Sequence, residues 1–364
     1  MKHVTVYRET GRFAGWPANY GVWSWGDEIA LGFTLGYTDL QGGFHARDKE
    51  RPFMNRQARS TNGGETWKVI PMPCKTPENR GLSADEHMNE GLRVGEVLDG
   101  EHAPTDCPGN VDFSHPDFAL MCARTGLGPG VCSFWYYSQD RCQSWKGPFY
   151  LPMWGQTGIA ARTDYLVDSA DQCTLFLTAN KRNGREGRVF AARSYDGGRK
   201  FGFLSWLSEE PEGFQIMPAS LRLSDGDILV AVRCTEHGEF TASKHWIDTY
   251  LSEDDGLTWT HVGRPVPASG QGGNPPTLTL LEDGRIVLTY GYRAAPYGIR
   301  ARISDATGTI WSEEIVLRND GGNADIGYPR TVLRPDGSLV TAYYYNDTPE
   351  GERYIGATIW KPGT

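Results

Sequence analysis

One eight-residue phrase recurs five times along this chain of 364 residues, and it restricts the possible folds more than any other feature. Each copy starts with serine, has a polar turn in its middle and ends with tryptophan or phenylalanine. The copies occupy residues 60–67, 138–145, 194–201, 252–259 and 304–311. Their starts are 78, 56, 58 and 52 residues apart, a spacing typical of propeller blades and not of helical repeats. We expect each copy to join two strands as a hairpin.

A second series of turns supports this division. Asp225-Gly226, Asp283-Gly284 and Asp336-Gly337 each precede an alternating apolar run, as at residues 228–232. After the last of these turns the chain supplies two more strand-like runs, and it ends before another copy of the phrase could complete a fourth strand. The run at residues 4–7 can take that place, which would remove an exposed sheet edge. We therefore predict an all-β, six-bladed propeller over residues 1–364, a single domain closed by its N-terminal strand.

Composition agrees with short strands and tight turns. The chain contains 45 Gly and 22 Pro, together with 12 Trp, 17 Tyr and 14 Phe. Its formal net charge of −9 argues against a nucleic-acid-binding protein. No run approaches the roughly 18 apolar residues that cross a bilayer, so we expect no membrane insertion. The opening residues lack the apolar core of a signal peptide, which favours a cytoplasmic location unless a signal was removed before this sequence, in which case the protein is secreted or periplasmic.

The seven cysteines form an odd set without a Cys-x-x-Cys pair. This pattern favours reduced thiols over a disulfide framework or a zinc site, so we expect no metal and no cofactor. Residues 71–110, between the first two copies of the phrase, form a long insertion rich in Pro, Gly and charge. An insertion of this length is typical of a lid or of a subunit contact, and the sequence does not choose between them.

The phrase Ser-x-Asp-x-Gly-x-x-Trp is the Asp-box, or BNR repeat, and through it the chain resembles the sialidase (neuraminidase) superfamily. The resemblance covers nearly the whole chain and implies a six-bladed propeller with the boxes at the blade periphery. Asp-boxes also occur in propellers with unrelated activities, so function has to come from other positions.

A set of arginines near strand ends of different blades can converge on the centre of such a propeller. Guanidinium groups there would bind a carboxylate or sulfate through paired, charge-assisted hydrogen bonds, although surface pairing with acidic residues is the alternative. The set comprises Arg162, Arg188, Arg233, Arg293, Arg300 and Arg330.

The resemblance assigns roles to three positions. Arg233 and Arg300 look like the second and third arginines that sialidases place on the substrate carboxylate, and Tyr328 takes the position of the nucleophilic tyrosine. Two family residues are missing, because Gly15 stands near the place of the first arginine and Met217 near that of the glutamate that assists the tyrosine. For the acid/base aspartate we prefer Asp48.

Other residues could complete the site. His45 accompanies Asp48 and could hold it in place or act as a base itself, and Trp16 belongs to a group of aromatic residues that could form a platform for a sugar. Asp164 and Glu186 each lie beside an arginine in the sequence. Each carboxylate could form a salt bridge with that arginine, or it could act as a catalytic acid or base. On an extended strand Arg330 would share a face with Tyr328 and favour its phenolate form.

These observations predict an exo-glycosidase of the sialidase type that hydrolyses a terminal anionic sugar from a glycan. Sialidases use tyrosine in place of the usual carboxylate nucleophile. The alternatives are a hydrolase or lyase that acts on a uronic-acid-containing glycan, with His45 or a tyrosine as base, and a sugar-binding propeller without catalysis. The expected partner is an anionic glycan or oligosaccharide, and no oligomeric state follows from the sequence.

Overall fold

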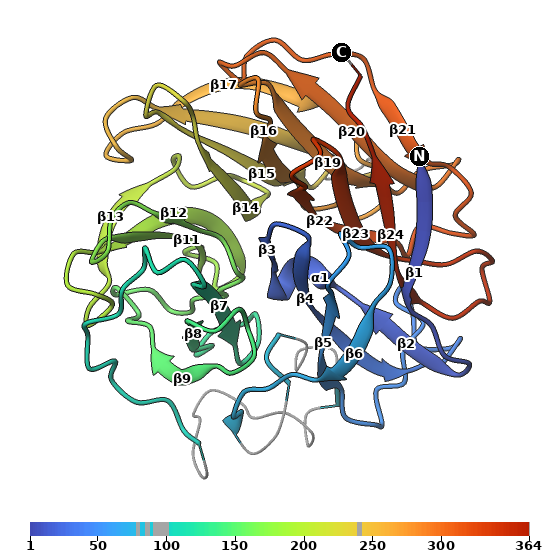
Figure 1. The fold of residues 1–364 in the computed structure, drawn as a ribbon, viewed down its shortest axis with the longest axis horizontal. Coiled ribbons are helices and arrows are strands. Elements are labelled where there is room, and N and C mark those ends of the chain that lie inside the picture. Colours follow the sequence, from blue (N-terminus) through green and yellow to red (C-terminus); the bar gives the residue numbers. More distant parts are fainter. Residues whose placement is uncertain (78–80, 84–87, 90–101, 239–241, 364) are drawn as a thin grey trace.

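The structure is a computed structural model and describes residues 1–77, 81–83, 88–89, 102–238 and 242–363. Six small antiparallel sheets surround a central axis (Figure 1), which confirms the predicted six-bladed propeller. Among the described residues, no helix is both long enough and apolar enough to cross a membrane. All seven cysteines are free thiols.

The blades follow one another around the ring. Blade 1 contains β2 (Arg12–Gly15), β3 (Val22–Trp25), β4 (Glu28–Tyr37), β5 (Met54–Ser60) and β6 (Lys68–Pro71). Blade 2 contains β7 (Ala119–Arg124), β8 (Ser133–Ser138) and β9 (Lys146–Tyr150). Blade 3 contains β10 (Tyr165–Val167), β11 (Cys173–Asn180), β12 (Glu186–Ser194) and β13 (Gly202–Trp206).

The second half of the chain forms three further blades of four strands each. Blade 4 contains β14 (Phe214–Arg222), β15 (Ile228–Glu236), β16 (Lys244–Ser252) and β17 (Thr260–Val266). Blade 5 contains β18 (Thr277–Leu280), β19 (Ile286–Tyr292), β20 (Gly298–Ser304) and β21 (Ile315–Arg318). Blade 6 contains β22 (Gly327–Leu333), β23 (Leu339–Tyr345), β24 (Tyr354–Trp360) and the N-terminal strand β1 (Lys2–Tyr7).

The N-terminal strand closes the ring, as predicted. β1 pairs antiparallel with β24, with His3 opposite Thr358 and Val4 opposite Ala357. Figure 1 shows the blue N-terminal strand beside the red C-terminal ones. Closure gives the last strand of blade 6 a partner and leaves the ring without an open seam between β24 and β1.

Each copy of the recurrent phrase connects the last two strands of a blade, which confirms the predicted hairpins. In the copy at residues 252–259, the Ser252 hydroxyl donates to Asp254 at 2.8 Å and accepts from the backbone N–H of Gly256 at 2.8 Å. Asp254 also accepts from Thr258, and these hydrogen bonds lower the pKa of its carboxyl to about 2. The phrase therefore forms a hydrogen-bonded turn at the periphery of the blades.

The innermost strands of three blades are broken by the same device, which we call the X-Pro bulge. In blade 1, β2 and β3 pair with two halves of β4, and the helical turn α1 (Pro17–Tyr20) lies between them. In blades 4 and 6 the register skips the pairs Met217-Pro218 and Tyr328-Pro329. The residue before each proline is left-handed, with φ of 57° at Trp16, 53° at Met217 and 50° at Tyr328.

A left-handed residue other than glycine costs about 1 to 3 kcal/mol, so it persists only where its surroundings hold it. Asn274 provides such a hold in blade 6, because its amide oxygen accepts from the backbone N–H of Tyr328 at 2.8 Å and its amide nitrogen donates to the carbonyl of Ile326 at 3.1 Å. Gly327 permits this approach, since a Cβ there would lie 2.4 Å from Asn274. The bulge of Tyr328 is therefore fixed by a fully buried amide.

The insertion at residues 71–110 lies partly outside the described residues. Of its described part, the backbone N–H of Leu82 donates to Asn55 at 3.0 Å and the carbonyl of Ser83 accepts from Arg124 at 3.0 Å. These contacts attach it to blades 1 and 2. Its role as a lid or subunit contact stays a prediction.

Candidate functional site

The helical turn α1 lies at the centre of the ring (Figure 1), and polar side chains from other blades contact it. Arg330 fixes this centre, because one of its nitrogens donates to the carbonyls of Ala18 at 2.7 Å and Thr163 at 2.5 Å. It thereby ties blade 6 to blades 1 and 3. The bulge at Tyr328 interrupts the strand alternation, so the expectation that Arg330 acts on the Tyr328 phenol because they share a face is wrong.

Two other arginines act on Tyr328 instead. Arg233 donates to the phenol oxygen at 3.3 Å, and the Arg293 guanidinium carbon lies 5.5 Å from the centroid of the ring. Burial raises the pKa of the phenol, but the positive charges of Arg233, Arg293 and Arg162 outweigh burial and lower it below its usual value. The surroundings therefore favour the phenolate, which is the nucleophilic form.

Arg233 and Arg293 are held by neutral groups. Arg233 also donates to the carbonyl of Gly272, and its Nε is buried without a hydrogen-bond partner in the described part of the chain. Arg293 donates to the carbonyls of Ile326 at 2.9 Å and Gly273 at 3.0 Å, and to the phenol oxygen of Tyr344 at 2.6 Å. Within the described residues, neither guanidinium has a carboxylate within 4.0 Å.

Such an arrangement is unusual, because buried charges are normally paired. Arg293 is only 3% exposed and Arg233 is partly buried, and burial lowers the pKa of the Arg233 guanidinium. An anionic ligand group would supply the missing counter-charge through charge-assisted hydrogen bonds.

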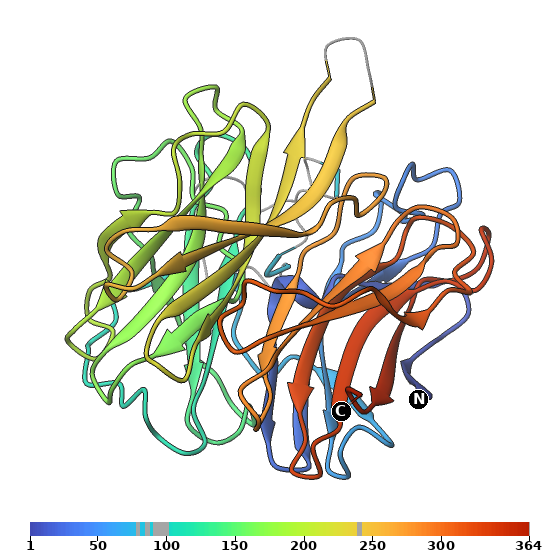
Figure 2. The same cartoon turned by 90° about the horizontal axis from the view of Figure 1, so that it is seen from above.

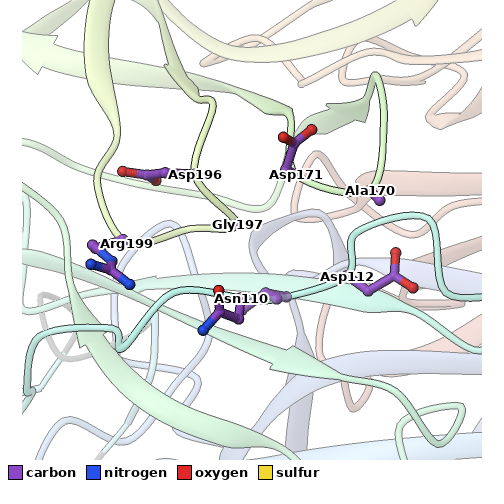
Figure 3. Close-up of a pocket in the computed structure, with 8 residues that line it drawn as sticks. Asn110, Asp112, Ala170, Asp171, Asp196, Gly197 and Arg199 are labelled. Atoms are coloured by element: carbon purple, nitrogen blue, oxygen red, sulfur yellow. The ribbon is translucent and has the colours of Figure 1, made fainter.

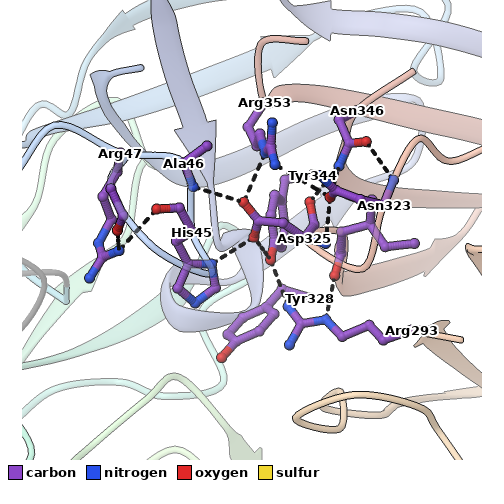
Figure 4. A network of polar contacts seen from close by, with 12 residues as sticks. His45, Ala46, Arg47, Arg293, Asn323, Asp325, Tyr328, Tyr344, Asn346 and Arg353 are labelled. Atoms are coloured by element: carbon purple, nitrogen blue, oxygen red, sulfur yellow. Dashed lines mark hydrogen bonds and ion pairs between the residues drawn. The ribbon is translucent and has the colours of Figure 1, made fainter. Parts of the chain in front are cut away.

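His45 forms the second part of the cluster. Its Nδ1 lies 2.6 Å from Asp325, whose carboxylate also accepts from Arg353 at 2.8 Å and from Tyr344 at 2.8 Å (Figure 4). Burial raises the pKa of Asp325, but His45 and Arg353 outweigh burial and hold it well below the usual range. An ionised Asp325 accepts a hydrogen bond from the Nδ1–H of His45. In a neutral imidazole the other nitrogen, Nε2, then carries the lone pair that can take a proton.

The same network joins His45 to the surroundings of Tyr328. Asp325 contacts Tyr344, Tyr344 accepts from Arg293, and the rings of Tyr328 and Tyr344 meet edge to face at 5.9 Å. Burial lowers the pKa of His45 even though Asp325 opposes this, which keeps the imidazole neutral near pH 7. A neutral imidazole oriented by a carboxylate can act as a general base.

Trp16 supports this histidine. Its ring meets His45 edge to face at 5.1 Å and is only 1% exposed. A platform for a sugar needs an open ring face, so the expected role of Trp16 as a platform is corrected to packing beneath His45.

Arg162 and Glu186 form a buried ion pair across blade 3, with Nη2 and Oε2 3.2 Å apart. Arg162 also donates to Asn19 of α1 at 3.3 Å. Of the two interpretations of Glu186, the salt bridge is the one observed, and its partner is Arg162 and not the adjacent Arg188. The positive charge of Arg162 thus lowers the pKa of Tyr328, while its guanidinium is already paired with Glu186.

Two of the predicted arginines are bound within their own blades. Arg188 donates to the carbonyl of Ser208 at 2.9 Å and stacks over Trp206 at 4.1 Å. Arg300 donates to Glu314 at 3.0 Å and to the carbonyl of Pro296 at 2.9 Å. Because Arg300 is already neutralised by a carboxylate, the pair suited to an anion is Arg233 with Arg293, which corrects the pairing expected from the resemblance.

The two predicted aspartates lie in different environments. Asp48 accepts from Arg51 at 2.8 Å, and this hydrogen bond lowers its pKa, which opposes a role as proton donor near pH 7. Burial raises the pKa of Asp164 to about 7 against the charge of Arg330. Together with Arg330, Asp164 lines a cavity of about 300 Å³ between the innermost strands. None of the contacts described above joins Asp164 to Tyr328 or His45.

Sequence reasoning missed four residues of the cluster: Asn274, Asp325, Tyr344 and Arg353. Asp325 lies three residues before Tyr328, on the loop that enters β22, and this short spacing is the only sequence feature that could have indicated it.

Apart from this cluster, an acidic region lies on the outside of blades 2 and 3. Asp112, Asp171 and Asp196 line a cavity of about 500 Å³ there (Figure 3). Each carboxylate accepts hydrogen bonds from its own loop, such as Ser114 to Asp112 at 2.7 Å and Ser169 to Asp171 at 2.6 Å. Among the residues that the structure describes, no His, Cys, Asp or Glu group could hold a metal ion. We therefore interpret these carboxylates as groups that stabilise their own loops.

Comparison with known proteins places the fold. Neither protein-family models nor curated proteins give a match to this chain. A crystal structure of a protein of unknown function from Dyadobacter fermentans is 21% identical with a TM-score of 0.72, over 98% of this chain and 97% of that one.

Two solved enzymes are also similar in structure. An α-L-arabinanase from Penicillium chrysogenum in complex with arabinobiose is 13% identical with a TM-score of 0.58, over 99% of this chain and 98% of that one. A mutant of the NanB sialidase from Streptococcus pneumoniae is 11% identical with a TM-score of 0.62, over 94% of this chain and 68% of that one. The chain therefore shares its propeller fold with sialidases and with an arabinan-degrading enzyme.

Proposed function

We propose that this protein is a glycosidase that releases a terminal anionic sugar, of the sialic-acid or uronic-acid class, from a glycan. The observation that carries the proposal is the pair of enclosed guanidiniums, Arg233 and Arg293, which flank the phenol of Tyr328 without a carboxylate partner among the described residues. A sugar carboxylate would pair with them and bring its anomeric carbon toward the phenol. The fold shared with glycosidases supports the same class of reaction.

In this mechanism Tyr328 is the nucleophile. Its phenol oxygen forms a bond to the anomeric carbon while the bond from that carbon to the leaving oxygen breaks. The phenol gives its proton to Nε2 of His45, and the imidazolium passes it to the leaving oxygen. Water then attacks the anomeric carbon, releases the sugar and returns a proton to the phenolate. Arg233 stabilises the phenolate before the attack and after the hydrolysis.

A lyase is the second candidate, and the His45–Asp325 contact favours it specifically. With the carboxylate of a uronic acid held by the arginines, Nε2 of His45 would remove the proton on the carbon beside that carboxylate. The electron pair would form a carbon–carbon double bond and expel the oxygen on the next carbon. The product would carry a double bond conjugated to the carboxylate, which absorbs in the ultraviolet.

A panel of chromogenic sialosides, uronides and neutral glycosides, together with uronic-acid oligosaccharides followed by ultraviolet absorbance, tests both candidates. Hydrolysis of an anionic glycoside without the ultraviolet product supports the glycosidase, whereas the ultraviolet product supports the lyase. Turnover of neutral glycosides alone would refute the role of the arginine pair. Binding without any product would leave the sugar-binding propeller as the correct alternative.

Tyr328→Phe separates the chemical step from binding. The variant should lose turnover while it binds the substrate almost as well as the wild type, because only the phenol oxygen is removed. Tyr354→Phe is a matched control, since the Tyr354 phenol also accepts from an arginine, Arg318, at 2.9 Å but lies in the outer part of blade 6. Full activity in Tyr328→Phe would refute the nucleophile.

A further inference from the structure

The loop of residues 269–274, Ser-Gly-Gln-Gly-Gly-Asn, connects β17 of blade 4 to β18 of blade 5. It begins at the base of the β15–β16 hairpin, where the backbone N–H of Ser269 donates to the carbonyl of His245 at 2.9 Å. Figure 2 shows this hairpin rising from one side of the ring. The loop ends at Asn274, and the two prolines that follow restrict the backbone there.

Glycines let this loop approach the two arginines of the site. Gly270, Gly272 and Gly273 are left-handed, with φ of 81°, 72° and 71°, a conformation that other residues rarely adopt. A Cβ at Gly270 would lie 2.2 Å from the carbonyl carbon of Arg293. A Cβ at Gly273 would lie 3.2 Å from Nε of Arg233. The backbone of the loop is thus shaped to lie against both arginines.

The loop holds both guanidiniums with uncharged acceptors. The carbonyl of Gly272 accepts from Arg233, and the carbonyl of Gly273 accepts from Arg293 at 3.0 Å. A carbonyl orients a guanidinium without cancelling its charge, whereas a carboxylate does both. The pair therefore keeps its charge for an anionic ligand.

The side chain of Asn274 holds the proposed nucleophile in the same way. Its Oδ1 accepts from the backbone N–H of Tyr328 at 2.8 Å and from that of Gly291 at 3.3 Å. Its Nδ2 donates to the carbonyl of Ile326 at 3.1 Å, and Nε of Arg293 donates to the same carbonyl at 2.9 Å. One amide therefore connects the bulge of Tyr328 with Arg293.

This amide lies in a close-fitting slot between blades 5 and 6. Asn274 is fully buried. A Cβ at Gly291 of β19 would lie 2.7 Å from its Cγ, and a Cβ at Gly327 of β22 would lie 2.4 Å from its Nδ2. The N–H groups on one side and the carbonyl on the other fix which end of the amide is oxygen. A displaced amide would leave the backbone N–H of Tyr328 without this acceptor.

We propose that Asn274 is a positioning residue of the reaction, which holds Tyr328 in the left-handed conformation that places its phenol beside Arg233. The carbonyls of Gly272 and Gly273 hold the anion-binding pair from the same loop. The loop thereby sets the position of the attacking oxygen relative to the groups that bind the substrate's charge. The inference rests on the proposed function and deepens it.

The ionisation of the phenol depends on this placement. Arg233 reaches the phenol oxygen at 3.3 Å, and the charges of Arg233, Arg293 and Arg162 lower the pKa of Tyr328 against the effect of burial. If the bulge relaxes, the phenol moves away from Arg233 and stays among buried groups. Its pKa should then rise above the usual value of about 10.

Titration of the phenols tests the hold of Asn274 without any substrate. In protein labelled with carbon-13 at tyrosine Cζ, NMR should show one phenol with a pKa below about 10, and this signal should be missing in Tyr328→Phe. Asn274→Ala should raise the pKa of that phenol. An unchanged titration in a folded Asn274→Ala variant would refute the positioning role.

Kinetics separates positioning from binding. For the anionic glycoside that the panel identifies, Asn274→Ala should lower kcat about hundredfold, because a displacement of about 1 Å can cost that factor. KM should change little, since the carbonyls of Gly272 and Gly273 still hold the arginines. A higher KM with an unchanged kcat would overturn the proposal, because it would mean that the amide supports binding alone.

Gln57→Ala is the matched control. Gln57, on β5, is also a fully buried amide between two blades, and its Nε2 donates to the carbonyl of Cys142 at 2.9 Å. Its substitution should lower the unfolding temperature and leave the phenol titration and kcat unchanged. Equal changes in both variants would show a general effect of truncating a buried amide, and the positioning role would be rejected.

Gly291→Ala provides the same test if Asn274→Ala does not fold. It keeps the amide but places a methyl group 2.7 Å from the present position of its Cγ, so the amide has to shift. The pKa of the Tyr328 phenol should rise in this variant too, and an unchanged pKa would contradict the proposal. If no anionic glycoside is cleaved, the proposed function falls while the titrations still decide whether Asn274 places the phenol. If the wild type is a glycosidase and neither variant alters the titration, the positioning role alone falls.

Discussion

Asp325→Asn should destabilise the protein far more than an ordinary surface substitution. The carboxylate is 1% exposed and joins blade 6 to the loop of His45, since it contacts His45, Arg353 and Tyr344. Asparagine has nearly the same size, so the change removes the charge and not the packing. Its amide nitrogen would face the Nε–H of Arg353 or the hydrogen on His45, which places one donor against another.

The magnitude follows from burial. Arg353 is 2% exposed, and breaking a buried ion pair by removing one charge costs about 3 to 5 kcal/mol. Arg353 keeps its hydrogen bond to the carbonyl of Gly351 at 2.7 Å, so we expect a loss near the lower limit, about 3 kcal/mol. This loss should appear as a lower midpoint of urea unfolding near pH 7, with an unchanged slope.

The loss should also depend on pH. Folding lowers the pKa of Asp325 below its unfolded value of about 3.9, so its stabilising effect is fully present above that pH and declines as the pH falls toward the folded pKa. The difference in unfolding free energy between wild type and Asp325→Asn should therefore be smaller near pH 3 than near pH 7.

Asp347→Asn provides the control. Asp347 also accepts from an arginine, Arg8 at 2.6 Å, and from a tyrosine, Tyr354 at 2.7 Å, but it is 40% exposed. Its substitution should cost no more than about 1 kcal/mol. Two results would contradict the energetic role assigned to the buried network. One is a loss of unfolding free energy in Asp325→Asn as small as that in this control, and the other is a loss that does not become smaller as the pH falls from 7 to 3.

Three further predictions use other parts of the molecule. Deletion of residues 1–7 removes β1 and should leave β24 as an open edge, so size-exclusion chromatography should show aggregates, and a monodisperse variant would contradict closure by this strand. Arg233→Met should weaken binding of the anionic substrate by about tenfold or more, because a hydrogen bond to a charged group contributes about 1.5 to 3 kcal/mol. Arg300→Met, in contrast, should lower the unfolding temperature with little effect on KM, because Arg300 is paired with Glu314. Cys74 is only partly buried, but its surroundings raise the pKa of its thiol to about 12, so little thiolate forms near pH 8 and the native protein should be labelled slowly at Cys74. Unfolding should make this labelling fast, and rapid labelling of Cys74 in the native protein would be the contrary result.

The architecture could be predicted from the sequence because its signals are local. The Asp254 carboxylate closes its own turn within four residues, Asp140 and Asp196 do the same in two other copies, and the amide oxygen of Asn62 does so in the first. The closing role of β1 follows from the sequence because the last blade lacks a fourth strand at the other end of the chain. Turn chemistry of this kind does not depend on distant residues.

The site could be predicted only in part, because its chemistry depends on distant contacts. Arg293 and Arg300 look alike in the sequence, and only the fold brings Glu314 to Arg300 and leaves Arg293 with neutral partners. Strand alternation predicts Arg330 on the same face as Tyr328, but the bulge at Tyr328-Pro329 interrupts the alternation. Beyond its spacing from Tyr328, Asp325 has no signal in the sequence, since its partners His45 and Arg353 lie 280 and 28 residues away.

The pairing of β1 with β24 also bears on how the protein is made. A chain synthesised from its N-terminus produces β1 before the five blades that follow it, and the partner of β1 comes only with β24. Until then both the nascent β1 and the incomplete blade 6 present unpaired backbone, which is the state in which chains aggregate or are captured by chaperones. A product that stops short of β24 cannot close its ring. Closure of the ring therefore has to wait for the last strand of the chain, although its partner strand is the first to be made.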